Sequence, residues 1–357
     1  MVPTGYLDPL AMVWVVPIWF AAAISGAANG GDDACCLLRQ ERTCPDVLTV
    51  GDVEMPKPGG GEVRVKLTTS GVNPSDVKSR GGSRKVMAPY VIPHSDGAGV
   101  IDVVGDGVPP GRIGERVWVW NGQWKRPFGT AAEYIVVPQA MAVPLPDKIG
   151  FEAGACLGIP AMTAIHAVDL AGVDEGTTLL IPGGAGGVGH YAIQFAKARK
   201  ANVITTVSSP SKAKLARGAG ADHVIDYKAE NVGERVMAIT GNRGADAVIE
   251  LDLAANAKHI PHVLRPKGTV VIYGTGAAEA TIPTQFCLIN GIRLQFMLVY
   301  ELTQEERERA VGGIMRLLKD NRLINNVALT LPLADIVAAH EAVEQGKTAG
   351  NVVVTLR

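Results

Sequence analysis

The sequence predicts an α/β protein in which a partly open β-barrel is followed by a doubly wound parallel sheet. Three observations lead to this prediction. Short valine-rich runs cut by glycine and proline fill residues 37–144, strand-like and helix-like segments alternate after Phe151, and a glycine-rich loop stands near the start of that alternation. With 357 residues, the chain is long enough for two domains of roughly 100–200 residues each.

The composition is that of a globular protein without a basic surface. Hydrophobic residues make up 47% and charged residues 19%, and 34 Lys and Arg face 35 Asp and Glu. Phosphate contacts require an excess of basic residues, so nucleic acid is not expected as the main partner. The five cysteines contain no Cys-x-x-Cys pair, which predicts neither a disulfide framework nor a zinc knuckle and favours a reducing compartment. They are Cys35, Cys36, Cys44, Cys156 and Cys287.

Residues 1–35 form an apolar extension before the predicted fold. No charge lies between Asp8 and Asp32, a length that approaches the roughly 20 apolar residues of a membrane span. No Lys or Arg precedes the run, unlike a secretory signal, and Pro17 interrupts it. Three interpretations stay open: a non-native extension, an anchor or export signal within residues 9–31, or an ordered segment. The folded part is expected to begin near Cys36, and without an anchor the protein is expected in the cytoplasm.

The barrel is predicted from β-like runs at regular spacing. These are Glu62–Thr68, Ala98–Val104, Glu115–Trp120 and Ala132–Val137, with turn clusters at 57–61 and 108–111.

The parallel sheet is predicted from strands that alternate with helices of about ten residues. The expected strands are Thr178–Ile181, Asn202–Val207, His223–Ile225, Ala245–Glu250 and Gly268–Tyr273. The expected helices are His190–Lys200, Ser211–Arg217, Asn231–Thr240 and Ala254–Leu264. A helix over Thr303–Lys319 and a strand over Asn351–Leu356 end the chain.

The glycine loop predicts a dinucleotide site. It reads Pro182-Gly183-Gly184-Ala185-Gly186-Gly187-Val188-Gly189, so that Gly184, Gly186 and Gly189 fit G-x-G-x-x-G between a strand and a helix. Such a loop brings backbone close to a pyrophosphate at a helix N-terminus.

The end of the second strand favours NADPH over NADH. An NAD site places an acidic residue about 20 residues after the loop, whereas this chain has Ser208, Ser209, Ser211 and Lys212 there. Hydroxyls and an ammonium suit a 2′-phosphate. The alternative for Lys212 is a solvated surface side chain.

Four motifs resemble the medium-chain dehydrogenase/reductase superfamily, and within it the zinc-free quinone oxidoreductase branch that includes zeta-crystallin. They are Gly71-Val72-Asn73-Pro74-Ser75-Asp76, Ser95-Asp96-Gly97-Ala98-Gly99-Val100, Gly158-Ile159-Pro160-Ala161-Met162-Thr163-Ala164 and the glycine loop. The resemblance implies a GroES-like catalytic domain (36–158 and 297–357), a Rossmann domain (159–296), and NADPH between them. It also implies that zinc ligands are replaced by Asn73, Ser95 and Ile159, so that no metal is expected. His259 and His262 are interpreted as surface histidines.

The resemblance also implies site residues. Asn73 and Thr163 match positions beside the nicotinamide, with a loop cap and a helix cap as the alternatives. Lys212 and Tyr227 match the 2′-phosphate contacts, and Gly274 matches a turn near the carboxamide. Lys347 adds charge near the cofactor, but Asn351 stands where the branch has lysine, which puts that turn in doubt.

The function that the resemblance implies is NADPH-dependent reduction of a quinone or similar conjugated acceptor by a homodimer. Tyr90, Asp76 and Lys78 are candidate proton donors, each with a structural alternative. Trp118, Trp120 and Trp124 are candidates to flank an aromatic acceptor, with one of the first two expected in the core. The alternatives are an enoyl or alkenal double-bond reductase and a non-catalytic NADPH-binding protein of the crystallin or RNA-contact type.

Overall fold

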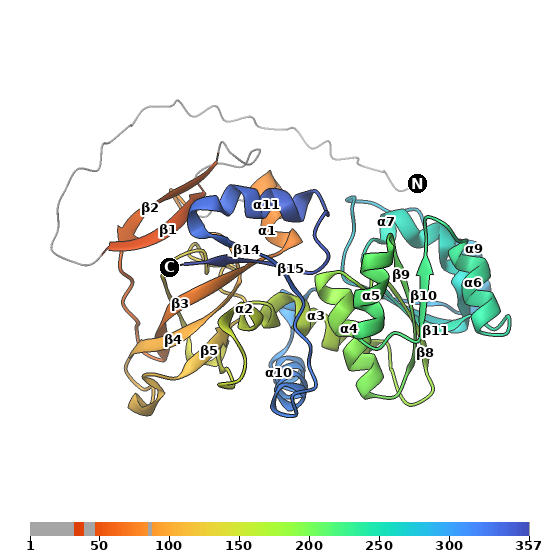
Figure 1. Cartoon of the computed structure of the whole chain (residues 1–357), viewed down its shortest axis with the longest axis horizontal. Helices are drawn as coiled ribbons and strands as arrows, with labels where there is room; N and C mark the ends of the chain where they lie inside the picture. The colour runs from red at the N-terminus through yellow and green to blue at the C-terminus, as the bar shows by residue number, and fades with distance from the viewer. Residues whose placement is uncertain (1–31, 39–46, 85–87, 357) are drawn as a thin grey trace, which may run out of the picture. The chain divides into compact units, whose positions relative to one another are not determined.

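The computed structural model describes residues 32–38, 47–84 and 88–356 (Figure 1). The apolar extension up to residue 31 and Cys44 lie outside the described residues. Strand β1 (Asp32–Leu38) pairs antiparallel with β2 (Leu48–Glu54), from Asp32 opposite Glu54 to Leu38 opposite Leu48. The predicted start near Cys36 is therefore late, because pairing with β2 already holds the backbone from Asp32 onward.

A seven-stranded sheet forms the barrel, in the order β14-β15-β3-β4-β5-β7 with β6 paired to β3. Side chains alternate along β3, so that Val63, Val65 and Leu67 point into the barrel core. The last strand of the chain, β15, pairs antiparallel with β3. The strands are β3 (Glu62–Val72), β4 (Asp96–Val104), β5 (Arg116–Val119), β6 (Tyr134–Pro138), β7 (Ala142–Pro144), β14 (Val327–Pro332) and β15 (Asn351–Thr355).

A six-stranded sheet holds the central part of the chain, in the order β10-β9-β8-β11-β12-β13 with every pair parallel. Its strands are β8 (Thr178–Pro182), β9 (Asn202–Val207), β10 (His223–Asp226), β11 (Ala245–Glu250), β12 (Leu264–Ile272) and β13 (Arg293–Phe296). The strand order reverses at β8, and ligands of such sheets bind beyond the carboxyl ends of the strands at this switch point. The predicted fold class, a partly open barrel plus a doubly wound sheet, is confirmed.

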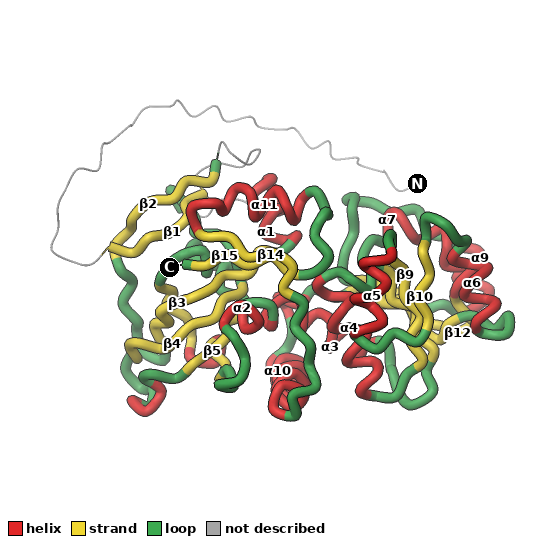
Figure 2. Tube along the Cα trace, in the orientation of Figure 1, coloured by secondary structure: helices red, strands yellow, loops and turns green. Residues whose placement is uncertain are grey.

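Helices cover both faces of the parallel sheet (Figures 1 and 2). Leu179 and Ile181 of β8 belong to the core under α4 and α5, whereas Leu180 packs with the core under α6 and α8. The helices are α1 (Pro74–Lys78), α2 (Phe151–Gly154), α3 (Met162–Leu170), α4 (Gly187–Ala198), α5 (Pro210–Gly218), α6 (Val232–Ile239), α7 (Leu253–Asn256), α8 (Ile260–Val263), α9 (Thr284–Asn290), α10 (Gln304–Lys319) and α11 (Ile336–Glu344).

One predicted helix is wrong. Residues 254–264 form α7, a short 3-10 turn and α8, and Leu264 already belongs to β12. Pro261 lies in the first turn of α8, where its missing N–H costs nothing, but it cannot continue a helix from upstream.

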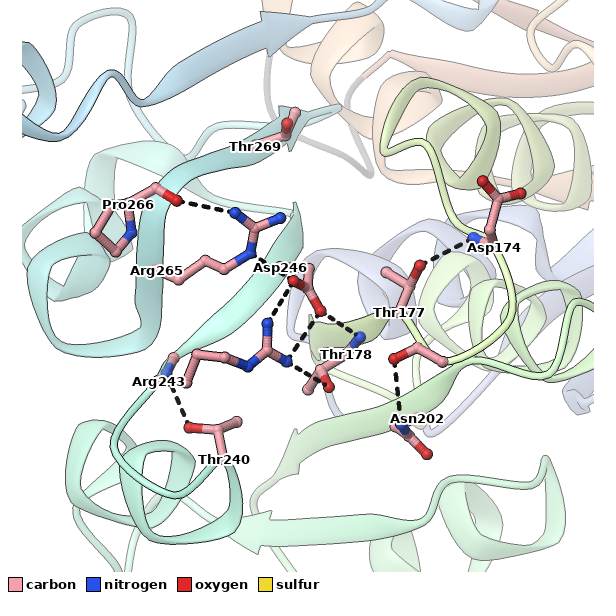
Figure 3. Close-up of polar contacts among 12 residues, drawn as sticks. Asp174, Thr177, Thr178, Asn202, Thr240, Arg243, Asp246, Arg265, Pro266 and Thr269 are labelled. Atoms are coloured by element: carbon pink, nitrogen blue, oxygen red, sulfur yellow. Dashed lines mark hydrogen bonds and ion pairs between the residues drawn. The ribbon is translucent and has the colours of Figure 1, made fainter.

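A polar cluster fixes the amino ends of the parallel strands (Figure 3). Asp246 of β11 accepts hydrogen bonds from the Thr178 N–H of β8 (2.7 Å), from Arg243 (2.6 Å) and from Arg265 of β12. Burial opposes the charge, yet the hydrogen bonds from Arg243, Thr178 and Arg265 lower the pKa of Asp246 to about 2. Ion pairs therefore stabilise the edge formed by the amino ends of the strands. The glycine loop lies at the opposite edge, at the carboxyl end of β8.

Candidate active site

The glycine loop joins β8 to α4 with its backbone packed too tightly for other residues. A Cβ at Gly184 would lie 2.1 Å from the Thr205 hydroxyl oxygen, and one at Gly189 would lie 2.4 Å from the Gly183 carbonyl oxygen. Gly183 itself has a φ of +72°. Because Gly186 is the N-cap of α4, the N–H groups of Gly187, Val188 and Gly189 lie in its first turn and have no partner inside the helix. These donors fit the pyrophosphate of a dinucleotide.

The residues predicted for the 2′-phosphate gather at the carboxyl ends of β9 and β10. Ser208 follows β9, and the backbone N–H of Tyr227 donates to the Val207 carbonyl (3.1 Å). Ser209 caps α5 by accepting from the Lys212 N–H. The Lys212 ammonium has no ion-pair partner in the described part of the chain, and Tyr227 is 52% exposed. Tyr227 and Lys212 therefore remain candidates for the 2′-phosphate contact, with an exposed ring and an ammonium that forms no ion pair in the described residues.

Asp96 joins the two segments expected beside the nicotinamide. Its carboxylate accepts from Asn73 Nδ2 (2.8 Å) and from the Ile159 N–H (2.9 Å), and the side chain is fully buried. Burial raises the pKa of Asp96 well above its usual range, although the bonds from Ile159 and Asn73 lower it. Asn73 and Ile159 are two of the positions that the family resemblance matches to zinc ligands. Hydrogen bonds to Asp96 join the two segments that carry them.

Asp76 lies in the turn of α1 that Asn73 begins. Its Oδ2 accepts the Asn73 N–H (2.8 Å), and the side chain is buried. Burial raises the pKa of Asp76 to about 7, against the opposing effect of the bond to Asn73. Among the candidate proton donors, Asp76 is thus a carboxyl group able to hold a proton near neutral pH.

The other predicted residues occupy different surroundings. Thr163 is buried at the start of α3, beside the π-helix (Leu157–Ala161) that carries Ile159. Lys78 donates to the Thr275 carbonyl (2.8 Å), next to Gly274, which lies against the Leu251 carbonyl. Tyr90 packs on Phe128 with ring centroids 5.7 Å apart, and no hydrogen bond or ring contact joins it to Asn73 or Thr163 in the described residues.

The turn before β15 reaches the glycine loop through Asn351. A Cβ at Gly187 would lie 2.5 Å from Asn351 Oδ1, while Asn351 Nδ2 donates to the Asn326 carbonyl (3.1 Å). Lys347 is exposed, and no ion pair holds it in the described chain. The neutral amide at position 351 therefore stands beside the first turn of α4.

The three tryptophans differ in role. One of Trp118 and Trp120 is expected in the core, and the structure buries both, at 0% and 3% exposure. Trp120 also packs under Arg307, whose Cζ lies 4.1 Å from its ring centroid. Trp124 instead stacks on Tyr300 at 4.5 Å, in the segment before α10. Sequence reasoning missed Tyr300 and also Arg84, whose Cζ lies 4.4 Å from the Trp124 centroid.

The described residues offer neither a metal site nor a membrane-spanning helix. They contain no group of three or more His, Cys, Asp or Glu side chains arranged to bind a metal. His259 and His262 are both exposed, as expected for surface histidines. No helix there combines the length and apolar character needed to cross a bilayer.

Comparison with known proteins identifies both regions. Residues 59–147 match the alcohol dehydrogenase GroES-like domain, and residues 187–314 match the zinc-binding dehydrogenase family. The chain is 30% identical to the quinone oxidoreductase of Rattus norvegicus, over 83% of this chain and 90% of the relative. It is 29% identical to a 2-haloacrylate reductase of a Burkholderia species, over 87% and 95%. A mycobacterial protein solved in complex with NADPH superimposes with a TM-score of 0.81 and 28% identity, over 91% of this chain and all of that one.

Proposed function

We infer that this chain, which belongs to the quinone oxidoreductase branch of the medium-chain dehydrogenase/reductase superfamily, reduces quinones or similar conjugated acceptors with NADPH. The observation that carries this proposal is the junction at Asp96, where Asn73 and Ile159 are joined by hydrogen bonds at positions assigned to metal ligands. An electron-poor acceptor needs little Lewis-acid help, so an orienting site is sufficient.

In this proposal the protein binds NADPH and the acceptor, orients them, and supplies a proton to the reduced acceptor. NADPH, when bound, supplies the hydride. The glycine loop and α4 would hold the pyrophosphate. Ser208, Lys212 and Tyr227 would hold the 2′-phosphate, and Gly274 and Lys347 would border the cofactor. Asn73 and Thr163 line the reacting end, and Asp96 fixes the orientation of the Asn73 amide. Asp76 holds a proton that the reduced acceptor requires.

A second candidate is reduction of a carbon–carbon double bond next to a carbonyl or carboxyl group. The similarity to a 2-haloacrylate reductase supports this second reaction. Both reactions deliver a hydride to a conjugated acceptor and use the same binding residues.

Loss of NADPH absorbance on addition of 1,4-naphthoquinone, and then of an enone, tests the proposal. Oxidation of NADPH in the presence of the quinone supports quinone reduction. Oxidation of NADPH by the enone but not by the quinone would instead support double-bond reduction. Tight binding of NADPH without turnover of either acceptor would instead favour the non-catalytic protein.

We also propose a homodimer located in the cytoplasm. The edge strand β13 and its neighbours expose apolar side chains, with Leu288 at 81%, Ile289 at 72% and Phe296 at 63%. Such a patch marks an association surface. Cys156 and Cys287 are free thiols, which supports a reducing compartment. Light scattering should give twice the mass of one chain, and the mass of a single chain would contradict the dimer. Cell fractionation tests the cytoplasmic location.

A further inference from the structure

Arg84, Trp124 and Tyr300 form a compact group that the proposed reaction does not use. The Arg84 Cζ lies 4.4 Å from the Trp124 ring centroid and 4.7 Å from that of Tyr300. The two rings stack on each other at 4.5 Å with 20° between their planes. Cation–π contacts of this kind hold a guanidinium in place without using its N–H donors. We call these three side chains the Arg84 cluster.

The guanidinium of the Arg84 cluster forms no ion pair with a carboxylate in the described residues. Arg84 is half-buried and makes no hydrogen bond or ion pair within residues 32–38, 47–84 and 88–356. The nearby carboxylate, Glu301, is already engaged by Lys125 Nζ (2.7 Å) and by Trp124 Nε1 (2.8 Å). An immobilised guanidinium with free donors binds carboxylate or sulfonate oxygens in a bidentate way.

The Arg84 cluster is joined to the proposed reacting end. Tyr300 Oη donates to Ser75 Oγ (2.8 Å), and Ser75 lies in the short helix that Asn73 begins. Asn121 Nδ2 donates to the Tyr300 carbonyl (3.1 Å) and fixes that segment from the barrel side. The charge of Arg84 also acts on the buried Asp76, lowering its pKa against the larger effect of burial. The cluster is therefore linked through Ser75 to the helix that Asn73 begins, and the charge of Arg84 acts on Asp76 of that helix.

We propose that Arg84 is an anion-binding residue of the acceptor site, so that the preferred acceptors are conjugated carbonyl compounds carrying a carboxylate or sulfonate. The proposal rests on the reductase function proposed above and adds the substrate class. The faces of Trp124 and Tyr300 give the guanidinium a fixed orientation, and the anionic group of the acceptor supplies its missing partner.

The test compares two acceptors that differ by one charge. We expect the intact protein to reduce 1,4-naphthoquinone-2-sulfonate with a higher kcat/KM than 1,4-naphthoquinone. Arg84→Gln should lower kcat/KM for the sulfonate about tenfold or more, mostly through KM, and change the neutral quinone less than about twofold. Arg84→Lys keeps the positive charge but not the planar guanidinium, so its kcat/KM for the sulfonate should lie between those of the unchanged protein and Arg84→Gln. Arg316→Gln, on the exposed face of α10, is the matched control and should change neither acceptor.

Two outcomes would overturn the inference: equal losses for both quinones in Arg84→Gln, or no preference for the sulfonate in the unchanged protein. Binding of naphthalene-2-sulfonate, which accepts no hydride, is measured by calorimetry on the same proteins. If neither quinone is reduced, the reductase function fails, but binding that is lost in Arg84→Gln still supports the anion site. Equal binding in Arg84→Gln and in the unchanged protein would reject it.

Discussion

Lys212 is the residue on which discrimination between NADPH and NADH is expected to depend. Its ammonium forms no ion pair in the described chain, and the residue lies in the first turn of α5, shortly after Ser208 at the end of β9. Lys212→Ala should raise the Kd for NADPH about 10- to 100-fold, the effect of a lost hydrogen bond to a charged group, and leave NADH nearly unchanged. Lys214→Ala, exposed on the same helix, is the control. Equal weakening of both nucleotides, measured by fluorescence titration, would reject the phosphate contact.

Residues differ in how far their surroundings could be predicted from the sequence. The glycines and Lys212 belong to local patterns whose chemistry is set by neighbours in the chain. The bond between Asn73 and Asp96 and that between Tyr300 and Ser75 join positions 23 and 225 apart. No local pattern carries such contacts, so the role of Asp96 and the Arg84 cluster emerge only from the fold. Trp120 illustrates the same limit, because Arg307, which packs on its ring, comes from the distant helix α10.

Among the elements, the loop between β8 and α4 is expected to tolerate no side chain at Gly184. A Cβ there would meet the Thr205 hydroxyl at 2.1 Å, and that hydroxyl is fixed by its bond to the Ile181 carbonyl (2.6 Å). Gly184→Ala should cost about 1–3 kcal/mol of unfolding free energy and weaken NADPH binding.

The matched control is Gly312→Ala within α10, where a Cβ meets nothing within 4 Å. Replacing a helix-interior glycine by alanine should stabilise by about 0.5–1 kcal/mol and leave NADPH binding unchanged. Chemical denaturation gives both values. Stability changes of the same sign in the two variants would show that general packing, and not the contact with Thr205, decides the result.

Long regular elements agree best with the sequence patterns. Strand β9 and helix α10 lie within a residue of their predicted bounds, and a capping box of Thr303 and Glu306 begins α10. Short elements are predicted less well. Strand β13 has four residues with largely exposed side chains, and Pro261 at the start of α8 separates it from the turn before it. Tertiary pairing, more than propensity, decides such segments.

On the scale of the whole molecule, the C-terminal segment completes the barrel that the N-terminal half begins. Strand β15 pairs with β3, and α11 inserts His340 against His94 in the barrel interior. The two Nε2 atoms are 2.9 Å apart, and His94 Nδ1 lies 2.9 Å from Ser70 Oγ. One ring must donate and the other accept, so the two imidazoles cannot both be protonated in the folded protein.

This histidine pair predicts acid sensitivity of the fold. Burial lowers the pKa of His340 to about 3, with a further lowering by Arg80, and burial with the neighbouring His340 lowers that of His94 well below its usual range. The unfolded chain binds these protons at its ordinary pKa near 6.5 and the folded chain does not. The free energy of unfolding is therefore not reduced by these two histidines above about pH 6.5. Below that pH it falls, by at most about 1.4 kcal/mol per pH unit for each histidine, until the pH reaches the pKa values of the folded protein.

His340→Gln isolates one of these groups. Asp76 and Asp96, whose pKa values burial raises, contribute with the opposite sign, because their ionised forms destabilise the fold as the pH rises. Both remain in the variant, as does the ion pair of Arg80 with Glu344, so their contributions cancel in the difference from the unchanged protein. We expect His340→Gln to be the less stable protein at pH 7.5, since its amide fits the ring cavity poorly, and the difference to shrink steadily between pH 6.5 and 4.5. Urea unfolding measures this difference. If it stays constant over the range, His340 does not gain a proton when the protein unfolds in acid, and the conclusion that His340 is neutral in the folded protein is wrong.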